Sequence, residues 1–263
     1  MIGAGNVATN MGKALLRAGH CIPQVYSRTP ASATALATAL RCKAVCRIED
    51  VCRDADIYVI AVKDTVIETV ATSLRSHCPG TLLIHTAGSV PLGVLGGAES
   101  RSGVVYPLQT FSTEREVDFS SIPCFIEASN AATLQAVASM ARSISGNVSE
   151  MRSERRKTLH LAAVFACNFT NHCYTLAAKV LEKQGIPFSA MLPLIDETAR
   201  KVHDMPPAEA QTGPAARNDT TVMEAHLNML DSKARAVYKL LSESILSQRD
   251  NGQAVRDNYG RDT

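Results

Sequence analysis

The first half of the chain alternates short apolar runs with amphipathic stretches. The runs over 56–62 and 81–85 are almost continuously apolar, which is typical of strands buried on both faces of a sheet. The stretches over 30–40, 65–76 and 131–144 repeat apolar residues at helical spacing. This alternation predicts an α/β fold with a doubly wound, mostly parallel sheet. Further strands are expected over 22–26, 43–45, 103–107 and 123–127.

The pattern changes after about residue 150. No strand signal follows, and three long helical stretches are predicted over 157–184, 189–202 and 220–248. We therefore expect an α/β domain over 1–150 and an all-α domain over 151–263. The apolar faces of the long helices exceed what three helices can bury against one another. We expect them to pack on the first domain and to form a homodimer.

A G-x-G-x-x-A turn begins at Gly3 and leads into a helical run. The first glycine permits a tight turn, the second lets the backbone approach a phosphate, and the alanine allows close packing of the helix on the sheet. The N-terminus of the helix supplies free N–H groups and a partial positive charge. The motif predicts a Rossmann-type site for a dinucleotide pyrophosphate, formed by Gly3, Gly5, Asn6, Val7 and Ala8.

Only Met1 and Ile2 precede this turn. The first strand of such a sheet normally supplies about five residues before its first glycine. The sequence therefore leads us to expect that the natural chain begins upstream, or that Met1 is an internal start.

The end of the strand predicted over 22–26 carries Ser27, Arg28 and Thr29. A site selective for NAD places a carboxylate here, to bind the ribose 2′-hydroxyl. Two hydroxyls and a guanidinium instead suit a 2′-phosphate, so we expect NADP(H) as the cofactor. The alternative is that the hydroxyls cap the next helix and that Arg28 is solvated.

Ligands of open α/β sheets bind at the carboxyl ends of the strands. Val62 and Lys63 end one predicted strand, and Ala87 and Gly88 follow another, so we expect all four along the cofactor. The loop after His85 is expected near the nicotinamide. An equally good interpretation of His85 is a buried histidine bonded to backbone.

Three residues of the second half are candidate catalytic residues. His160 and Asn168 lie about 80° apart on the first long helix, and polar groups in such an apolar helix are costly unless they bind something. The alternative is a polar network between helices, or a dimer contact. Arg217 follows a Gly-Pro loop and could clamp an anionic group of the substrate, whereas Asp219 could cap the next helix.

Composition narrows the class of protein. The chain has 263 residues and a net charge of +2, with no long basic block, no charged-then-apolar leader and no apolar run of membrane-spanning length. We expect a soluble, cytoplasmic protein that binds a small-molecule substrate and neither nucleic acid nor membrane. The eight cysteines form no C-x-x-C pair, so we expect free thiols and no metal site.

Several motifs together resemble one family. The G-x-G-x-x-A turn, the segments 61–64 and 106–111, the Asn168 segment and the Thr212 loop are similar to those of Rossmann-like NADP oxidoreductases with a helical C-terminal domain of unknown function. The group is similar to pyrroline-5-carboxylate reductase, to deazaflavin-dependent NADP reductases and, more distantly, to prephenate dehydrogenase. The resemblance implies an N-terminal NADP-binding domain and a helical domain that shapes the substrate site and usually dimerises.

The chain departs from these relatives at Tyr106. Prephenate dehydrogenase carries a histidine where this chain has Tyr106, and tyrosine titrates far above neutral pH. We therefore do not expect Tyr106 to act as a general base. Hydroxyacid dehydrogenases related by fold use a lysine on the first long helix, where His160 is the nearest polar candidate and Lys157 lies just ahead of it.

These observations favour an NADP(H)-dependent oxidoreductase that acts on a small carbonyl, imine or hydroxy compound. The alternative is a non-catalytic NADP(H)-binding sensor or interaction module. A Rossmann protein that binds S-adenosylmethionine is disfavoured by Arg28.

Overall fold

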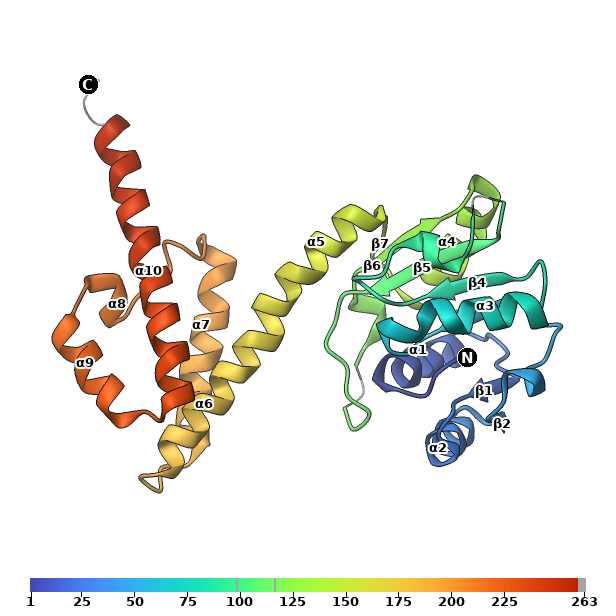
Figure 1. The fold of residues 1–263 in the computed structure, drawn as a ribbon, viewed down its shortest axis with the longest axis horizontal. Coiled ribbons are helices and arrows are strands. Elements are labelled where there is room, and N and C mark those ends of the chain that lie inside the picture. The colour runs from blue at the N-terminus through green and yellow to red at the C-terminus, as the bar shows by residue number, and fades with distance from the viewer. Residues whose placement is uncertain (98, 116, 260–263) are drawn as a thin grey trace. The chain divides into compact units, whose positions relative to one another are not determined.

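The computed structural model describes residues 1–97, 99–115 and 117–259, with side chains described as far as residue 248. The chain divides into two compact units, Met1–Asn168 and Phe169–Thr263. The first is the α/β part of the molecule and the second is helical (Figure 1). The division falls inside the long helical stretch that follows the sheet, whereas the predicted domain boundary lies at the end of the last strand.

The first unit contains one mostly parallel sheet. Two strands pair side by side, and a further five strands follow one another in chain order. Ile2 forms parallel bridges with both Tyr26 and Ile60, and so joins the two groups. The strands are β1 (Gln24–Tyr26), β2 (Lys43–Val45), β3 (Ile57–Ile60), β4 (Leu82–His85), β5 (Ser102–Pro107), β6 (Cys124–Ala128) and β7 (Val148–Glu150).

The order across the sheet is β2, β1, Ile2, β3, β4, β5, β6 and β7. All neighbours are parallel except β5 and β6, which run antiparallel with Tyr106 opposite Phe125. The mostly parallel, doubly wound sheet predicted from the sequence is confirmed. Strand β7 was not predicted, because three residues without a fully buried side chain give no apolar run.

Helices cover both faces of the sheet, and the alternation of side chains along each strand explains how. On β3, Val59 packs with α1 and α4 on one face, while Tyr58 and Ile60 pack with α3 on the other. Helix α2 packs beside α1 through Leu36 and Leu40. The helices of this unit are α1 (Asn6–Arg17), α2 (Pro30–Leu40), α3 (Ile67–His77), α4 (Ala131–Ile144) and α5 (Ser153–Ala163).

The long helix that leaves the sheet starts earlier than predicted, at Ser153, and is not uniform. A π-helical turn, Val164–Phe169, separates α5 from α6 (Thr170–Glu182). The second predicted helix corresponds to α7 (Leu192–Asp204) and the short 3₁₀ turn before it.

The prediction of a single helix over 220–248 is wrong. The structure has α9 (Thr220–Met229) and α10 (Ser232–Tyr259), with a break at Leu230 and Asp231. The Asp231 carboxylate accepts hydrogen bonds from the N–H groups of Lys233 (3.1 Å) and Ala234 (3.0 Å), so it caps the start of α10. Helix α8 (Pro214–Arg217) precedes both.

The helical unit buries few side chains. Among its residues 169–248, only Ala215 and Ala234 are buried. No helix in the described part of the chain is long and apolar enough to cross a membrane.

Candidate cofactor and active site

The turn at Gly3 can be built only from glycine. Its φ is +115°, and a Cβ there would lie 2.2 Å from the carbonyl oxygen of Ala61. Gly5 precedes α1 and has no heavy atom within 4 Å of the place a Cβ would take. The first turn of α1, which includes Asn6, Val7 and Ala8, carries no acidic residue. The N–H groups of this first turn therefore have open space and no competing charge, as an anion site requires.

The side chain of Asn6 has a role that the sequence did not indicate. Its amide donates to the carbonyl oxygen of Phe111 (2.8 Å), and the Asn10 amide donates to those of Ser112 (2.8 Å) and Asn6 (2.9 Å). These bonds fasten the loop that follows β5 to the start of α1. They place this loop beside the glycine turn.

Ser27, Arg28 and Thr29 lie at the carboxyl end of β1, with Arg28 and Thr29 exposed. The Ser27 hydroxyl accepts a hydrogen bond from the Thr29 N–H (3.3 Å), and Thr29 makes no side-chain cap to α2. Arg28 forms no ion pair or hydrogen bond within the part of the chain that the structure describes. Its side chain is open to solvent just beyond the carboxyl end of β1.

Gly88, Tyr106 and His160 meet at the carboxyl ends of β4 and β5. The Tyr106 hydroxyl lies 3.1 Å from Nδ1 of His160, and the two rings pack edge to face with centroids 5.9 Å apart. A Cβ on Gly88 would lie 2.7 Å from Nδ1 of His160 and 2.8 Å from Cζ of Tyr106. The glycine therefore permits this close packing. Its neighbour Ser89 donates a hydrogen bond to the Asp64 carboxylate.

His85 is a buried histidine bonded to backbone. It is 0% exposed, and its Nδ1 accepts a hydrogen bond from the Ala87 N–H (3.2 Å). Burial, and to a smaller extent the nearby Arg156 cation, lower its pKa to about 3. The imidazole is thus neutral near pH 7. Val62 and Lys63 follow β3, half-buried and exposed respectively.

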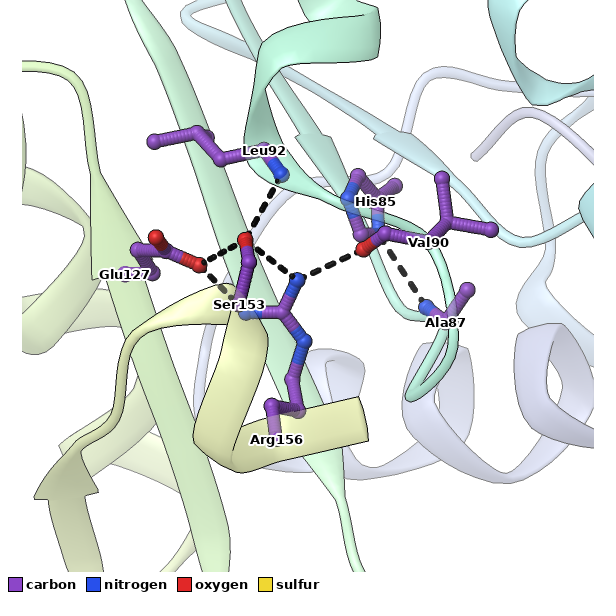
Figure 2. A network of polar contacts seen from close by, with 7 residues as sticks. All are labelled: His85, Ala87, Val90, Leu92, Glu127, Ser153 and Arg156. Atoms are coloured by element: carbon purple, nitrogen blue, oxygen red, sulfur yellow. Dashed lines mark hydrogen bonds and ion pairs between the residues drawn. The ribbon is translucent and has the colours of Figure 1, made fainter. Parts of the chain in front are cut away.

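A buried polar network holds the loop that carries Gly88 (Figure 2). The guanidinium of Arg156, 0% exposed, donates to Glu127 on β6 (2.5 Å) and to the carbonyl oxygen of Val90 (2.6 Å). The Ser153 hydroxyl donates to the same carboxylate (2.7 Å) and accepts from the Leu92 N–H (3.0 Å). The network joins β6, the loop after β4 and the first turn of α5. Sequence reasoning missed it, because its members come from three distant segments.

The other two candidate catalytic residues, Asn168 and Arg217, lie in different units of the chain. Asn168 is exposed at the end of the first unit, within the π-helical turn, where departures from α geometry often mark functional sites. Arg217 is exposed on α8 of the helical unit. Asp219 caps α9 by accepting from the Val222 N–H (3.2 Å), which is the structural role considered for it.

A cavity of about 360 Å³ lies at the opposite end of the strands. Its lining includes His20, Gln24, Asp56 and Tyr58, from the amino ends of β1 and β3. Dinucleotides bind doubly wound sheets at the carboxyl ends, so this cavity is separate from the candidate site. All eight cysteines are free, and the described residues contain no His, Cys, Asp and Glu group suited to a metal ion.

Comparison with known proteins agrees with this geometry. Residues 1–88 match the family model "NADP oxidoreductase coenzyme F420-dependent", and residues 122–245 match the domain of unknown function DUF2520. The comparison with curated proteins found no match. Among solved structures, the "putative NADP oxidoreductase" BF3122 from Bacteroides fragilis is 48% identical over 94% of this chain and 96% of its own, with a TM-score of 0.90.

More distant structures share the fold. An imine reductase from Myxococcus stipitatus, in complex with NADP+, is 18% identical over 96% of this chain and 93% of its own (TM-score 0.65). A pyrroline carboxylate reductase from Plasmodium falciparum with NADP bound is 15% identical over 94% and 96% (TM-score 0.58). Because a relative is 48% identical along nearly its whole length and both domain models match, the chain belongs to the NADP oxidoreductase family whose Rossmann domain is followed by a DUF2520 domain.

Proposed function

We propose that the protein is an NADP(H)-dependent oxidoreductase that transfers a hydride to or from a small carbonyl, imine or hydroxy substrate. One observation carries the proposal. The carboxyl ends of neighbouring strands hold both the open glycine turn before α1 and the packed cluster of Gly88, Tyr106 and His160. A dinucleotide lying across these strand ends has its pyrophosphate at α1 and its nicotinamide toward the cluster.

The residues at these strand ends fit the cofactor. Gly3 forms the turn, Gly5 leaves room for the pyrophosphate, and the first-turn N–H groups of α1 supply donors. Arg28, free of protein partners among the described residues, supplies a positive charge for the 2′-phosphate, with Ser27 and Thr29 beside it. When bound, the nicotinamide supplies or accepts the hydride, and the protein provides placement and hydrogen-bond donors.

The remaining roles complete the proposal. Asn168 and His160 act near the reacting carbon, and Arg217 clamps an anionic group of the substrate. The helical domain shapes the substrate site and forms a homodimer, as the resemblance to this family implies. Exposure of Asn168 and Arg217 leaves both side chains available for such contacts.

Calorimetric titration with NADPH and with NADH tests the cofactor assignment directly. We expect NADPH to bind more tightly than NADH, and Arg28→Ala to weaken NADPH binding by about tenfold or more, as loss of a charge-assisted contact predicts. Arg41→Ala, which removes a cation just after α2, is the matched control. Equal affinity for the two cofactors, unchanged by Arg28→Ala, contradicts the NADP(H) preference.

A turnover assay separates the enzyme from a non-catalytic sensor. NADPH oxidation is followed with pyruvate, 2-oxobutanoate and 2-methyl-1-pyrroline as probes of the oxo-acid and imine classes. We expect one class to be reduced. Tight NADPH binding with no turnover of either class favours the sensor.

A further inference from the structure

Tyr106 and His160 form a hydrogen-bonded pair at the carboxyl ends of the central strands. Their contact joins residues 54 positions apart in the chain, at 3.1 Å between the phenol oxygen and Nδ1. Tyr106 is 8% exposed, while His160 is half-buried. The pair therefore links a buried phenol to an imidazole that is less deeply buried.

The surroundings of Tyr106 keep its phenol protonated. Burial raises its pKa above the usual value for tyrosine, and the Cys167 thiol and the Asp64 carboxylate act in the same direction. Arg156 is the one group among those acting on it that opposes them. A phenol in this environment is neutral near pH 7 and can donate its proton or a hydrogen bond.

Gly88 allows the Tyr106 ring to pack directly against the loop that follows β4. The phenol ring and the imidazole both occupy the space directly over its Cα, so that even a methyl group would overlap them. Gly88 follows β4, on the loop that the Arg156 network holds in place. Under the proposed function, this loop adjoins the nicotinamide, so the phenol lies beside the atom that receives the hydride.

We propose that Tyr106 is the proton donor of the reduction and that His160 resupplies its proton. This inference rests on the proposed function. It extends it by assigning a catalytic role to Tyr106 and a defined partner to His160.

The proton and electron count closes. Hydride from the reduced nicotinamide adds to the carbonyl carbon, the C=O π pair moves to oxygen, and that oxygen takes the phenolic proton. The phenolate takes the proton from Nδ1 of the His160 imidazolium, and the neutral imidazole is reprotonated from solvent. In the oxidative direction each step reverses, with neutral His160 accepting from Tyr106.

The chain contains its own matched control. His226 and Tyr238, in the helical unit, form a second pair with Nδ1 3.0 Å from the hydroxyl and rings 5.9 Å apart, edge to face. Tyr238→Phe removes the same kind of hydrogen bond without touching the strand ends. It separates loss of a Tyr–His bond in general from loss of the proposed donor.

The test compares Tyr106→Phe, His160→Gln and Tyr238→Phe in the full chain with NADPH and the oxo-acid and imine probes. We expect Tyr106→Phe to lower kcat about 100-fold or more with KM and NADPH affinity within about twofold, since general acid catalysis contributes about 10²–10⁴. His160→Gln should also lower kcat, and Tyr238→Phe should match the parent.

A second readout needs no substrate. The readout is the ¹⁵N NMR spectrum of the unliganded chain, in which His160→Gln assigns the His160 signals. If the Tyr106 hydroxyl donates to Nδ1, the proton of the neutral His160 ring is on Nε2. We expect Tyr106→Phe to change the ring nitrogen shifts of His160, and Tyr238→Phe to change those of His226 alone.

The outcomes are distinguishable. Full kcat in Tyr106→Phe, or His160 signals that ignore this substitution, overturns the relay and leaves the proposed function standing. Absence of NADPH binding in the parent chain overturns the proposed function and the relay with it. If NADPH binds but no probe is turned over, the sensor is favoured and the proton relay is overturned.

Discussion

Gly3 and Gly5 perform different tasks within a single turn. Gly3 has a positive φ and no room for a Cβ, so Gly3→Ala combines backbone strain with a clash against the Ala61 carbonyl. We expect it to lower the free energy of unfolding by about 3 kcal/mol or more. Urea denaturation followed by circular dichroism measures the loss.

Gly5→Ala is the paired substitution. Gly5 has φ −88° and ψ −171°, which any residue can adopt, and open space around its Cα hydrogens. We expect stability to stay within about 0.5 kcal/mol of the parent. NADPH binding should weaken by about tenfold, because the new methyl group occupies the path of the pyrophosphate. Unchanged affinity for NADPH would place the cofactor elsewhere.

His85 makes the fold sensitive to acid. Its pKa is about 3 when folded and about 6.5 when unfolded, so below pH 6.5 the unfolded chain takes up a proton that the folded chain refuses. This site should cost about 1.4 kcal/mol of stability per pH unit between 6.5 and 3. His85→Asn keeps an acceptor for Ala87 and cannot titrate.

The quantity to measure is the difference in the free energy of unfolding between the parent and His85→Asn. Urea unfolding of the parent and of His85→Asn is repeated at several pH values. As the pH falls from 6.5 to 3, the parent should lose stability relative to His85→Asn by about 1.4 kcal/mol per pH unit. Parallel curves for the two chains would show that the pKa of His85 is the same in the folded and unfolded chains, which contradicts the prediction.

At the scale of elements, the Arg156 network is the contact that unites β6, the loop after β4 and α5. Arg156→Met leaves the Glu127 carboxylate and the Val90 carbonyl without their buried partner. We expect a loss of about 3–5 kcal/mol and faster hydrogen exchange at the Leu92 N–H, which the same network holds. Arg155→Met, at the exposed neighbouring position, should leave both unchanged.

A double-mutant cycle checks the mechanism of that loss. In Glu127→Gln with Arg156→Met, no uncompensated charge remains, so the combined cost should fall well below the sum of the single costs. Additive costs would mean that the two side chains act independently and that the loop is held by other contacts.

The elements predicted correctly are those with a local signal. The apolar runs of β3 and β4 and the glycine turn before α1 are each contained in a few consecutive residues. The break between α9 and α10 was missed because Asp231 resembles an ordinary exposed helical residue until its carboxylate is seen capping the next helix. The pairing of Tyr106 with His160 has no local signal at all, since the sheet brings together segments 54 residues apart.

For the whole molecule, the alternation of strands and helices predicted the doubly wound sheet and the helical second half, both of which the structure has. The assembly of the units is a different matter, because apolar stripes on helices show that a surface needs covering without showing what covers it. Asn168 and Arg217 depend on that assembly. Their predicted roles therefore remain proposals, whereas Gly3 and Gly88 have geometric reasons within one unit.

We expect the helical unit to form a homodimer. Large apolar side chains on α7 and α10 are exposed to solvent, with Leu194 61% and Leu240 68% exposed. Among residues 169–248, only two alanines are buried. A unit with so little core of its own gains most by burying these faces against a second copy. Sedimentation velocity should give twice the mass of one chain. Leu194→Lys with Leu240→Lys should halve it, because a buried interface tolerates an unpaired ammonium poorly.

Leu16→Lys is the control, because Leu16 lies on α1 of the first unit and is 36% exposed. It should leave the dimer intact. Dissociation by this control as well would place the contact on the α/β unit, and a monomeric parent chain would rule the dimer out. NADPH affinity should survive dissociation in the double variant, since the glycine turn, Arg28 and the strand ends all belong to one unit of one chain.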